Sequence, residues 1–159
     1  LRRANMIFIV EGPDGSGKTT LCHKLLVANK GRYLHFSYPK NKAEADNMFT
    51  DYMETLIRYR DEDVVIDRMW PSTQVYGEIL RGKSEISYEQ GLLLEKAIKS
   101  KGVFVYCTDT FKVMWDRCKQ RGEDYVTDYG TYLRICRMYD TVMRRQKHIL
   151  PVLTYTASY

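Results

Sequence analysis

Residues 11–20, with the sequence EGPDGSGKTT, directly follow the apolar run at residues 6–10. The stretch from Gly12 to Thr19 matches the pattern G-x-x-x-x-G-K-[ST], and apolar residues at helical spacing come next. Glycines allow consecutive backbone N–H groups to curl around phosphate oxygens, and the start of the next helix adds the positive end of its dipole. A strand, a glycine-rich loop and a helix in this order predict a site for the phosphates of a nucleotide.

The residue types within the loop have separate predicted roles. Lys18 can span the β- and γ-phosphates of ATP, and the Thr19 hydroxyl can ligate Mg²⁺. ATP and Mg²⁺ are therefore the expected cofactors. The alternative is a glycine-rich turn that only joins a strand to a helix, but the four fixed positions rarely coincide by chance in that setting. The candidate ATP-binding residues are Gly12, Pro13, Asp14, Gly15, Ser16, Gly17, Lys18, Thr19 and Thr20.

Length and composition bound the rest of the interpretation. The 159 residues, 44% of them hydrophobic, suffice for one domain with a core and are too few for two. We interpret residues 1–5, which precede a plausible initiator at Met6, as an expression remnant or a flexible N-terminus, and residues 6–159 as the domain. The net charge of +5 is compatible with acidic small molecules or with nucleic acid. Because no apolar run approaches the roughly 18 residues of a membrane span, we expect no membrane contact and a cytoplasmic location.

Short apolar or β-branched runs alternate with longer stretches of helical spacing, which is the pattern of a parallel sheet covered by helices. Helices are expected after the glycine loop, from a capping box at Ser87 and Gln90 toward Gly102, and over residues 111–120 and 132–148. The predicted fold class is therefore α/β with a five-stranded parallel sheet flanked by helices. The expected strands are residues 6–10, 33–37, 64–67, 103–107 and 151–156.

An Asp-Arg pair follows the third expected strand. Three apolar residues deliver Asp67 and Arg68 to the carboxyl end of this strand, the edge at which open α/β sheets bind ligands. Asp67 could hold Mg²⁺ or orient the attacking oxygen of a phosphoryl acceptor, and Arg68 could form two parallel hydrogen bonds to a phosphate. The alternative is a surface ion pair at a strand end. Beside the glycine loop, the pair favours phosphoryl transfer, with Thr19 and Asp67 as metal ligands.

The two motifs together resemble a known family. The stretch EGPDGSGKTT followed by DRMWPSTQVYG is similar to the thymidylate kinase branch of the nucleoside monophosphate kinases, and most similar to the compact versions encoded by bacteriophages. The resemblance extends over most of the chain. It implies a P-loop kinase fold with a short mobile lid, here at about residues 117–130, and Mg²⁺-dependent transfer of the γ-phosphoryl group of ATP to a nucleoside monophosphate. It also suggests a homodimer and, if the chain is phage-encoded, a location in the host cytoplasm.

The resemblance also implies how the acceptor nucleotide is bound. Asp14 corresponds to the family's loop aspartate, which contacts the 3′-hydroxyl of the sugar, and the Asp-Arg pair lies at the acceptor phosphate and the metal. Tyr76 corresponds to a residue against C2′ of the sugar, where its ring would crowd a 2′-hydroxyl, so a deoxyribonucleotide and a dTMP-like acceptor are favoured. From the residues alone, this segment could equally be the first turns of a helix begun by Pro71. The candidate acceptor-binding residues are Asp14, Tyr38, Lys40, Phe49, Arg68, Ser72, Thr73 and Tyr76.

Part of the acceptor side departs from the family. After the second strand the family usually has Phe-Pro and then an arginine that grips the acceptor phosphate, whereas residues 36–42 read Phe-Ser-Tyr-Pro-Lys-Asn-Lys. Lys40 or Lys42 could substitute as a point charge without the bidentate fork. Phe49 and Tyr52 lie in the helical stretch where the family places an aromatic ring that stacks on the base, and the sequence does not choose between them.

The lid departs from the family as well. The bacterial type commonly has Arg-Gly followed shortly by Asp-Arg, whereas residues 121–125 read Arg-Gly-Glu-Asp-Tyr, so the second lid arginine is absent. Arg117 and Arg121 remain candidates for contacting the transferred phosphoryl group. Together with Lys18, Asp67 and Arg68 they form the set of candidate catalytic residues. For these two arginines, the alternative is a pair of solvated charges at a helix end.

Two other functions are compatible with the same motifs. The first is a kinase whose acceptor is a deoxynucleoside or a modified base in DNA, which the missing phosphate-gripping arginine favours. The second is a regulatory module that binds ATP without transferring phosphate, which the presence of Asp67, Arg68 and Tyr76 disfavours. One group of basic residues could contact nucleic acid: Arg134, Arg137, Arg144, Arg145 and Lys147. A solvated helix face accounts for this group equally simply, so contact with nucleic acid is not favoured.

Overall fold

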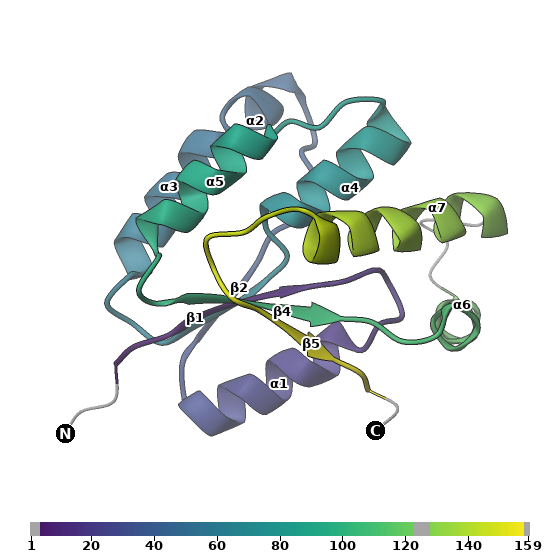
Figure 1. Cartoon of the computed structure of the whole chain (residues 1–159), viewed down its shortest axis with the longest axis horizontal. Coiled ribbons are helices and arrows are strands. Elements are labelled where there is room, and N and C mark those ends of the chain that lie inside the picture. The colour runs from purple at the N-terminus through teal and green to yellow at the C-terminus, as the bar shows by residue number, and fades with distance from the viewer. Residues whose placement is uncertain (1–3, 123–127, 158–159) are drawn as a thin grey trace.

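The predicted strands form one sheet in which neighbouring strands are all parallel (Figure 1). The strands are β1 (Ile7–Glu11), β2 (Arg32–His35), β3 (Val64–Asp67), β4 (Gly102–Cys107) and β5 (Val152–Tyr155), in a computed structural model that describes residues 4–122 and 128–157. Their order in the sheet is β2-β3-β1-β4-β5. The chain therefore places β2 and β3 on one side of β1 and then β4 and β5 on the other. Ligands of such open sheets bind where the order reverses, at the carboxyl ends of the strands.

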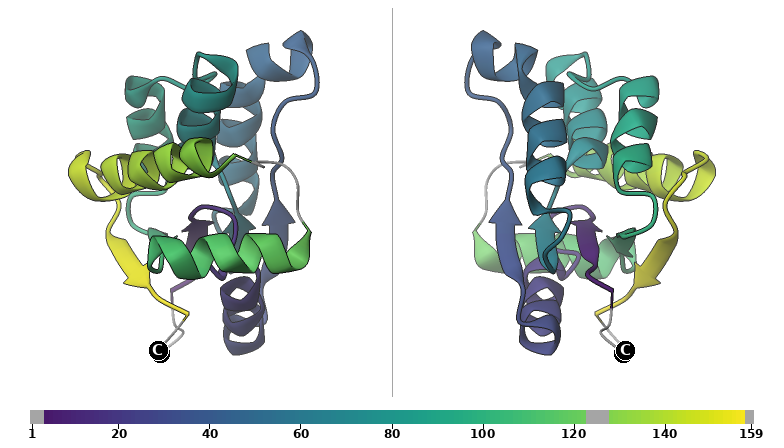
Figure 2. Two further views of the ribbon diagram at one scale, coloured as in Figure 1. Left: turned by 90° about the vertical axis from the view of Figure 1, so that its right-hand side faces the viewer. Right: turned by 90° about the vertical axis from the view of Figure 1, so that its left-hand side faces the viewer.

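Helices cover both faces of this sheet. They are α1 (Lys18–Asn29), α2 (Lys42–Asp46), α3 (Met48–Tyr59), α4 (Trp70–Arg81), α5 (Tyr88–Ala97), α6 (Phe111–Arg121) and α7 (Tyr129–Asp140), and a π-helical segment η1 (Thr141–Arg145) continues α7. Figure 1 shows α1 against one face and α3, α4, α5 and α7 over the other. The two views of Figure 2 agree, and they show α6 running across the carboxyl ends of the strands. The carboxyl edge of the sheet is therefore bordered by loops, by α6 and by the start of α4.

The core divides according to which face of the sheet a side chain occupies. Alternate residues of a strand point to opposite faces, and Ile9, Ile66 and Phe104 accordingly belong to the large cluster beneath α3, α4, α5 and α7. Val10 and Val65 belong to a smaller cluster against α1. The central strands β1, β3 and β4 are buried on both faces and are continuous apolar runs, which explains why they are recognisable in the sequence. The edge strands β2 and β5 are more exposed.

The helix predicted over residues 132–148 differs from the observed one. It begins earlier, as α7, and ends in η1 instead of continuing to His148. The cause lies in Glu95 of α5, a buried carboxylate that accepts the backbone N–H groups of Ile149 and Leu150 at 2.9 and 3.1 Å and lies 3.2 Å from Nδ1 of His148. These contacts with a residue distant in sequence hold the chain in an extended path toward β5. Helical spacing alone does not reveal such a contact.

The α/β prediction with a five-stranded parallel sheet is confirmed, and so are two of the local predictions. The capping box at Ser87 and Gln90 begins α5, and α6 covers the helix expected at residues 111–120. Residues 123–127 of the expected lid, which include most of the altered lid motif, lie outside the described residues. Among the described helices, none is both long and apolar enough to span a membrane.

Candidate functional site

The glycine-rich loop follows β1 at the carboxyl edge and is held closely by its neighbours. Gly12 and Gly15 have positive φ angles of 155° and 80°. A Cβ atom on Gly12 would lie 2.3 Å from the carbonyl oxygen of Cys107, and one on Gly15 would lie 2.4 Å from that of Met114. Both positions therefore require glycine for the backbone angle and for the space. The loop takes its shape from β4 and α6 as well as from its own residues.

Lys18 begins α1 directly behind this loop. Its side chain is buried, and its Nζ donates to the carbonyl oxygen of Pro13 at 3.5 Å, so the ammonium group folds back over the loop. Burial lowers the pKa of Lys18, and the nearby Arg68 adds to this effect. Thr19 and Thr20 are exposed in the first turn of α1. The structure thus brings an ammonium group, a helix N-terminus and a hydroxyl to one place, as the loop motif predicts.

Two side chains from α6 and α7 support the outer carbonyls of the loop. Arg117 donates through Nη1 to the carbonyl oxygen of Gly15 at 3.1 Å and pairs through Nη2 with Asp109 at 3.3 Å. The hydroxyl of Tyr132 donates to the carbonyl oxygen of Asp14. Arg117 was a candidate for the transferred phosphoryl group, and its contacts place it against the loop. Tyr132 was not singled out from the sequence, because a tyrosine in a helical apolar pattern gives no sign of such a contact.

Arg68 connects the loop to the start of α4. It has a positive φ of 70°, which is uncommon outside glycine and directs its side chain away from β3. Its Nη2 pairs with Oδ1 of Asp14 at 2.6 Å, while Nη1 donates to the hydroxyls of Ser72 at 3.1 Å and Tyr139 at 2.7 Å. The guanidinium also lies 5.2 Å from the centre of the Tyr76 ring. The surface ion pair considered for Asp67 and Arg68 is therefore not formed, since Arg68 is mostly buried and pairs with Asp14.

Glu11 is another residue of this site that the sequence did not reveal. It ends β1, is fully buried, and accepts hydrogen bonds from the backbone N–H of Met69 at 2.6 Å and from the Ser72 hydroxyl at 2.5 Å. Burial raises the pKa of Glu11 to about 7, although Ser72 and Arg68 oppose the shift. Its position before the first glycine was visible, but the partners that fix it come from α4, 58 or more residues later. Glu11 joins β1 to the start of α4.

Asp67 faces β2. Its Oδ2 accepts a hydrogen bond from the Tyr33 hydroxyl at 2.8 Å and lies 3.4 Å from Nδ1 of His35. Its Oδ1 is buried and has no hydrogen-bond partner among the described residues, and the same holds for Oγ of Ser16 in the loop. Buried polar atoms are normally paired. The two atoms are therefore suited to receive a bound ion or a phosphate group.

The donor set at this edge fits Mg²⁺. This ion usually takes one or two protein oxygens and completes its shell with waters and phosphate oxygens. The unpartnered Oδ1 of Asp67 and the exposed hydroxyl of Thr19 are oxygens of this kind. Nowhere in residues 4–122 and 128–157 do three or more His, Cys, Asp or Glu side chains gather in a way that could hold a metal. The arrangement thus suits an ion that arrives with a nucleotide rather than one held in a protein cage.

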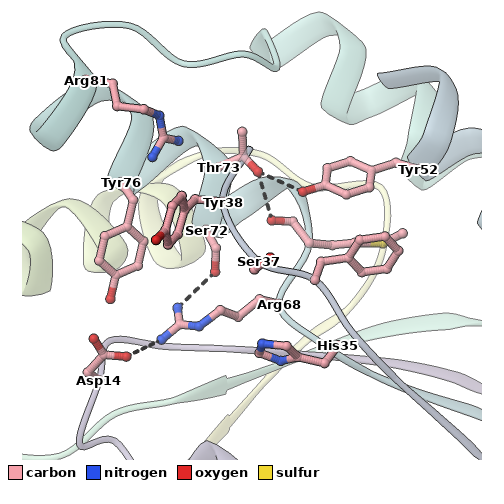
Figure 3. A pocket seen from close by; sticks show the side chains of 12 residues that line it. Asp14, His35, Ser37, Tyr38, Tyr52, Arg68, Ser72, Thr73, Tyr76 and Arg81 are labelled. Carbon is pink, nitrogen blue, oxygen red and sulfur yellow. Dashed lines mark hydrogen bonds and ion pairs between the residues drawn. The ribbon is translucent and has the colours of Figure 1, made fainter. Parts of the chain in front are cut away.

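A pocket of about 260 Å³ opens beside the loop (Figure 3). Tyr52 contributes its ring from α3, with its hydroxyl 2.9 Å from Oγ1 of Thr73, and the Phe36 ring packs edge-on against it at 5.1 Å. Arg68 and Asp14 form one end and Arg81 lies at the other, as Figure 3 shows. One end is therefore polar and close to the phosphate loop, while the middle is aromatic. The lining residues are Asp14, His35, Phe36, Ser37, Tyr38, Tyr52, Arg68, Met69, Ser72, Thr73, Tyr76 and Arg81.

The structure does not bring every sequence candidate to this pocket. Tyr38 lines it, but Lys40 is exposed and its backbone N–H donates to Glu44, which directs the chain into α2. Phe49 is partly buried and packs against the large core cluster. Tyr52, three residues further along α3, lines the pocket instead. Lys42 pairs with Asp46 on the surface. Lys40, Phe49 and Lys42 thus lie outside the pocket lining, and a contact of any of them with the acceptor stays a prediction.

Arg121 and the basic residues of the C-terminal third also lie elsewhere. Arg121 is exposed as the last residue of α6. Residues 123–127, which follow it, lie outside the described part of the chain. A contact of Arg121 with the transferred phosphoryl group stays a prediction. Of the basic group, Arg144 pairs with Asp140 at 3.6 Å and covers the Tyr106 ring. All five members are exposed, as a solvated helix face would be; they are Arg134, Arg137, Arg144, Arg145 and Lys147.

Comparison with known proteins places this architecture among nucleotide-binding folds. No protein-family model matches the chain. The SPbeta prophage-derived protein YorR of Bacillus subtilis (strain 168) is 30% identical over 125 residues, which cover 76% of this chain and 72% of that protein. The crystal structure of YorR from Bacillus subtilis in complex with phosphorylated GDP has a TM-score of 0.77 at 26% identity, covering 96% of this chain and 86% of that chain. Deoxyadenosine kinase from M. mycoides with bound dATP has a TM-score of 0.66 at 16% identity, covering 97% and 92%, so the fold is that of P-loop nucleoside kinases.

Proposed function

The chain belongs to the same family as YorR of Bacillus subtilis, and we propose that it transfers the γ-phosphoryl group of ATP to a deoxynucleoside monophosphate, giving the diphosphate. One observation carries the proposal. The pair between Asp14 of the glycine-rich loop and Arg68 of the pocket, at 2.6 Å, joins the proposed triphosphate site to a pocket of about 260 Å³. Two nucleotides bound on either side of this pair would present their phosphates to each other.

The protein groups on the donor side would act by positioning and by charge. Loop N–H groups and the N-terminus of α1 would hold the β- and γ-phosphates, and Lys18 would leave the Pro13 carbonyl to bridge them. When bound, Mg²⁺ would be held by Thr19 and Asp67 and would neutralise charge on the phosphate oxygens. The acceptor phosphate would attack in line, so no covalent intermediate with the protein is required.

The acceptor side would bind the second nucleotide through Arg68 and the aromatic wall. Arg68 keeps a guanidinium at the end of the pocket nearest the loop, where an acceptor phosphate would lie. Tyr76 packs beneath this guanidinium, and its ring would exclude a 2′-hydroxyl, which favours deoxyribonucleotides. Tyr52 and Phe36 would contact the base. The resemblance to thymidylate kinases favours a dTMP-like acceptor, and the YorR complex makes a guanine nucleotide the second acceptor to test.

The proposal is tested by measuring ATP consumption with Mg²⁺ across nucleosides and nucleoside monophosphates, in deoxy and ribo forms and with modified pyrimidines. We expect turnover with at least one deoxynucleoside monophosphate, a weaker response to its ribo counterpart, and loss of activity when EDTA removes the metal. ATP binding without turnover on any acceptor would instead indicate a regulatory module. Replacing Tyr76 by Leu should narrow the difference between deoxy and ribo acceptors if the ring excludes the 2′-hydroxyl.

A nucleoside acceptor is the second candidate function. It is favoured by the positions of Lys40 and Lys42, which lie outside the pocket, so neither replaces the phosphate-gripping arginine. In that case Arg68 and Asp14 would bind the sugar, and the monophosphate would be the product. Turnover with deoxynucleosides and none with their monophosphates would establish this alternative. The same panel of acceptors therefore separates the two functions.

A further inference from the structure

Arg81 lies at the end of the pocket opposite Arg68, and Figure 3 shows its guanidinium pointing back into the pocket. It is the last residue of α4. Side chains of a helix lean toward its N-terminus, so a long side chain at this position reaches back over the preceding turn. Thr73, Gly77 and Arg81 follow one another at four-residue spacing on one face of α4, and Thr73 and Arg81 both line the pocket. Arg81 is thus placed where the base of an acceptor would lie.

The orientation of this guanidinium is fixed by Glu85. Nε of Arg81 donates to Oε1 of Glu85 at 2.6 Å, and Nη2 donates to Oε2 at 3.0 Å, which is a bidentate fork. The Glu85 side chain is mostly buried, whereas 26% of the Arg81 side chain is exposed. A Cβ atom on Gly77 would lie 2.9 Å from Oε2 of Glu85, from the carbonyl oxygen of Lys83 and from Cα of Ser84, so the bare backbone of α4 makes room for the turn that carries the carboxylate. The fork uses Nε and Nη2 and does not engage the two N–H donors of Nη1.

This inference rests on the proposed function: we propose that Arg81, oriented by Glu85, contacts the base of the acceptor and selects bases with a keto oxygen at C4 of a pyrimidine or C6 of a purine. A guanidinium carries only donors. A keto oxygen accepts from it, whereas the amino group of cytosine or adenine at the same position would set donor against donor. Thymine, uracil, guanine and hypoxanthine are thus accepted, and cytosine and adenine are disfavoured.

The test compares pairs of acceptors whose bases differ by a keto or an amino group and by the proton on the adjacent ring nitrogen, so the variants below decide whether Arg81 reads the difference. These pairs are dUMP with dCMP, and dIMP with dAMP. For the wild-type protein we expect kcat/KM to favour the keto member of the pair that fits the pocket by about tenfold to a hundredfold. A preference for the amino member would overturn the inference.

Two variants then ask whether Arg81 causes the preference. R81Q presents both a donor and an acceptor and should bring the ratio within a pair close to one, while turnover of the amino member is kept or raised. E85A leaves the backbone of α4 unchanged but removes the carboxylate that orients Arg81, and it should reduce the ratio in the same direction. The control is R32Q, which removes an exposed pair with Glu62 at the start of β2, far from the pocket, and should keep the wild-type ratio. A wild-type ratio in R81Q, with the protein folded by circular dichroism, would mean that Arg81 only holds the turn after α4.

A binding measurement separates this inference from the proposed function. Calorimetry with the same four nucleotides reports base preference even when no phosphoryl group is transferred. If no acceptor is turned over but the keto members bind more tightly and R81Q removes the difference, the proposed function fails and the base contact stands. If turnover occurs while neither kcat/KM nor affinity responds to R81Q, the proposed function stands and the base contact fails.

Discussion

The phosphate loop and the acceptor pocket share one wall, but they are built in different ways. The loop is a continuous stretch of eight residues, 12–19, in which backbone N–H groups, glycines and one lysine carry the chemistry. The pocket collects side chains from the loop, from the ends of β2 and β3, and from α3 and α4. Asp14 belongs to both, because it is a loop residue whose carboxylate pairs with Arg68.

This difference determines which feature of the proposed reaction each region would control. A backbone cradle binds phosphates whatever base they carry, so under the proposed function the loop would fix the type of donor group and the position of transfer. A pocket lined by side chains from several elements can change one lining residue without disturbing the others, and it would therefore set the identity of the acceptor. Substitutions that affect one region and leave the other unchanged test this division.

The largest expected effect is on the loop. Lys18→Ala removes the ammonium group from the phosphates. We expect kcat to fall by at least about a hundredfold for every acceptor, since catalysis of phosphoryl transfer depends chiefly on stabilising the charge of the transferring group. Acceptor affinity should stay within a few-fold of wild type. Lys24→Ala, which removes an exposed lysine of the same helix, is the control and should keep activity. Equal losses of ATP and acceptor affinity in Lys18→Ala would argue against two separable regions.

The second effect concerns the shape of the loop. Gly15→Ala combines a φ of 80° with a Cβ atom 2.4 Å from the Met114 carbonyl oxygen, and should lower the free energy of unfolding by about 2–5 kcal/mol. Gly82→Ala is a matched control, because φ is 75° and no atom of the described residues lies within 4 Å of the added Cβ, so only about 1–2 kcal/mol of backbone strain is expected. Urea denaturation measures both. Similar losses would show that α6 does not constrain the loop.

The same division explains what could be predicted from the sequence. Lys18, Thr19 and the glycines stand next to one another, so their spacing alone identifies the loop. The central strands β1, β3 and β4 were equally visible, because burial on both faces leaves continuous apolar runs. Asp67 and Arg68 were found because the end of a buried strand is a predictable place for site residues.

The rest could not be predicted because it depends on contacts between distant segments. Phe49 and Tyr52 are both aromatic and three residues apart, and only the packing of α3 decides that Tyr52 lines the pocket. Glu11 and Tyr132 act through partners 58 and 118 residues away. The end of the last helix likewise depends on Glu95, whose side chain accepts the backbone N–H groups that follow it. Propensity and spacing describe neither kind of contact.

A third prediction concerns Glu11, which precedes the loop but contacts Met69 and Ser72 on the acceptor side. Its pKa is about 7 in the folded protein and near 4.5 when unfolded, so the folded state binds more protons between these values and loses stability as pH rises through them. The loss is up to about 3 kcal/mol. Glu11→Gln should remove this slope and gain stability over wild type from pH 5 to pH 8.

Urea denaturation at a series of pH values measures the Glu11 effect directly. Glu62→Gln, at an exposed glutamate, is the control and should give a curve parallel to wild type. If the pH dependence of the free energy of unfolding is also the same in Glu11→Gln and in wild type, the Glu11 carboxylate stays charged in the folded protein at every pH tested. The wall between the two regions would then hold a buried charge stabilised by Ser72 and Arg68 rather than a carboxyl group that titrates near neutrality.

The smallest expected effect tests the support that α7 gives to the loop. Tyr132→Phe removes the hydroxyl that donates to the Asp14 carbonyl and keeps the ring, which packs among Phe111 and Trp115. One hydrogen bond contributes about 0.5–1.5 kcal/mol, so ATP affinity measured by calorimetry should weaken by about twofold to tenfold. Tyr129→Phe changes an exposed ring of the same helix and should leave ATP affinity unaltered. Because Asp14 also pairs with Arg68, a loss of acceptor affinity equal to the loss of ATP affinity would mean that this support is transmitted to the pocket, and the two regions would then be coupled through Asp14.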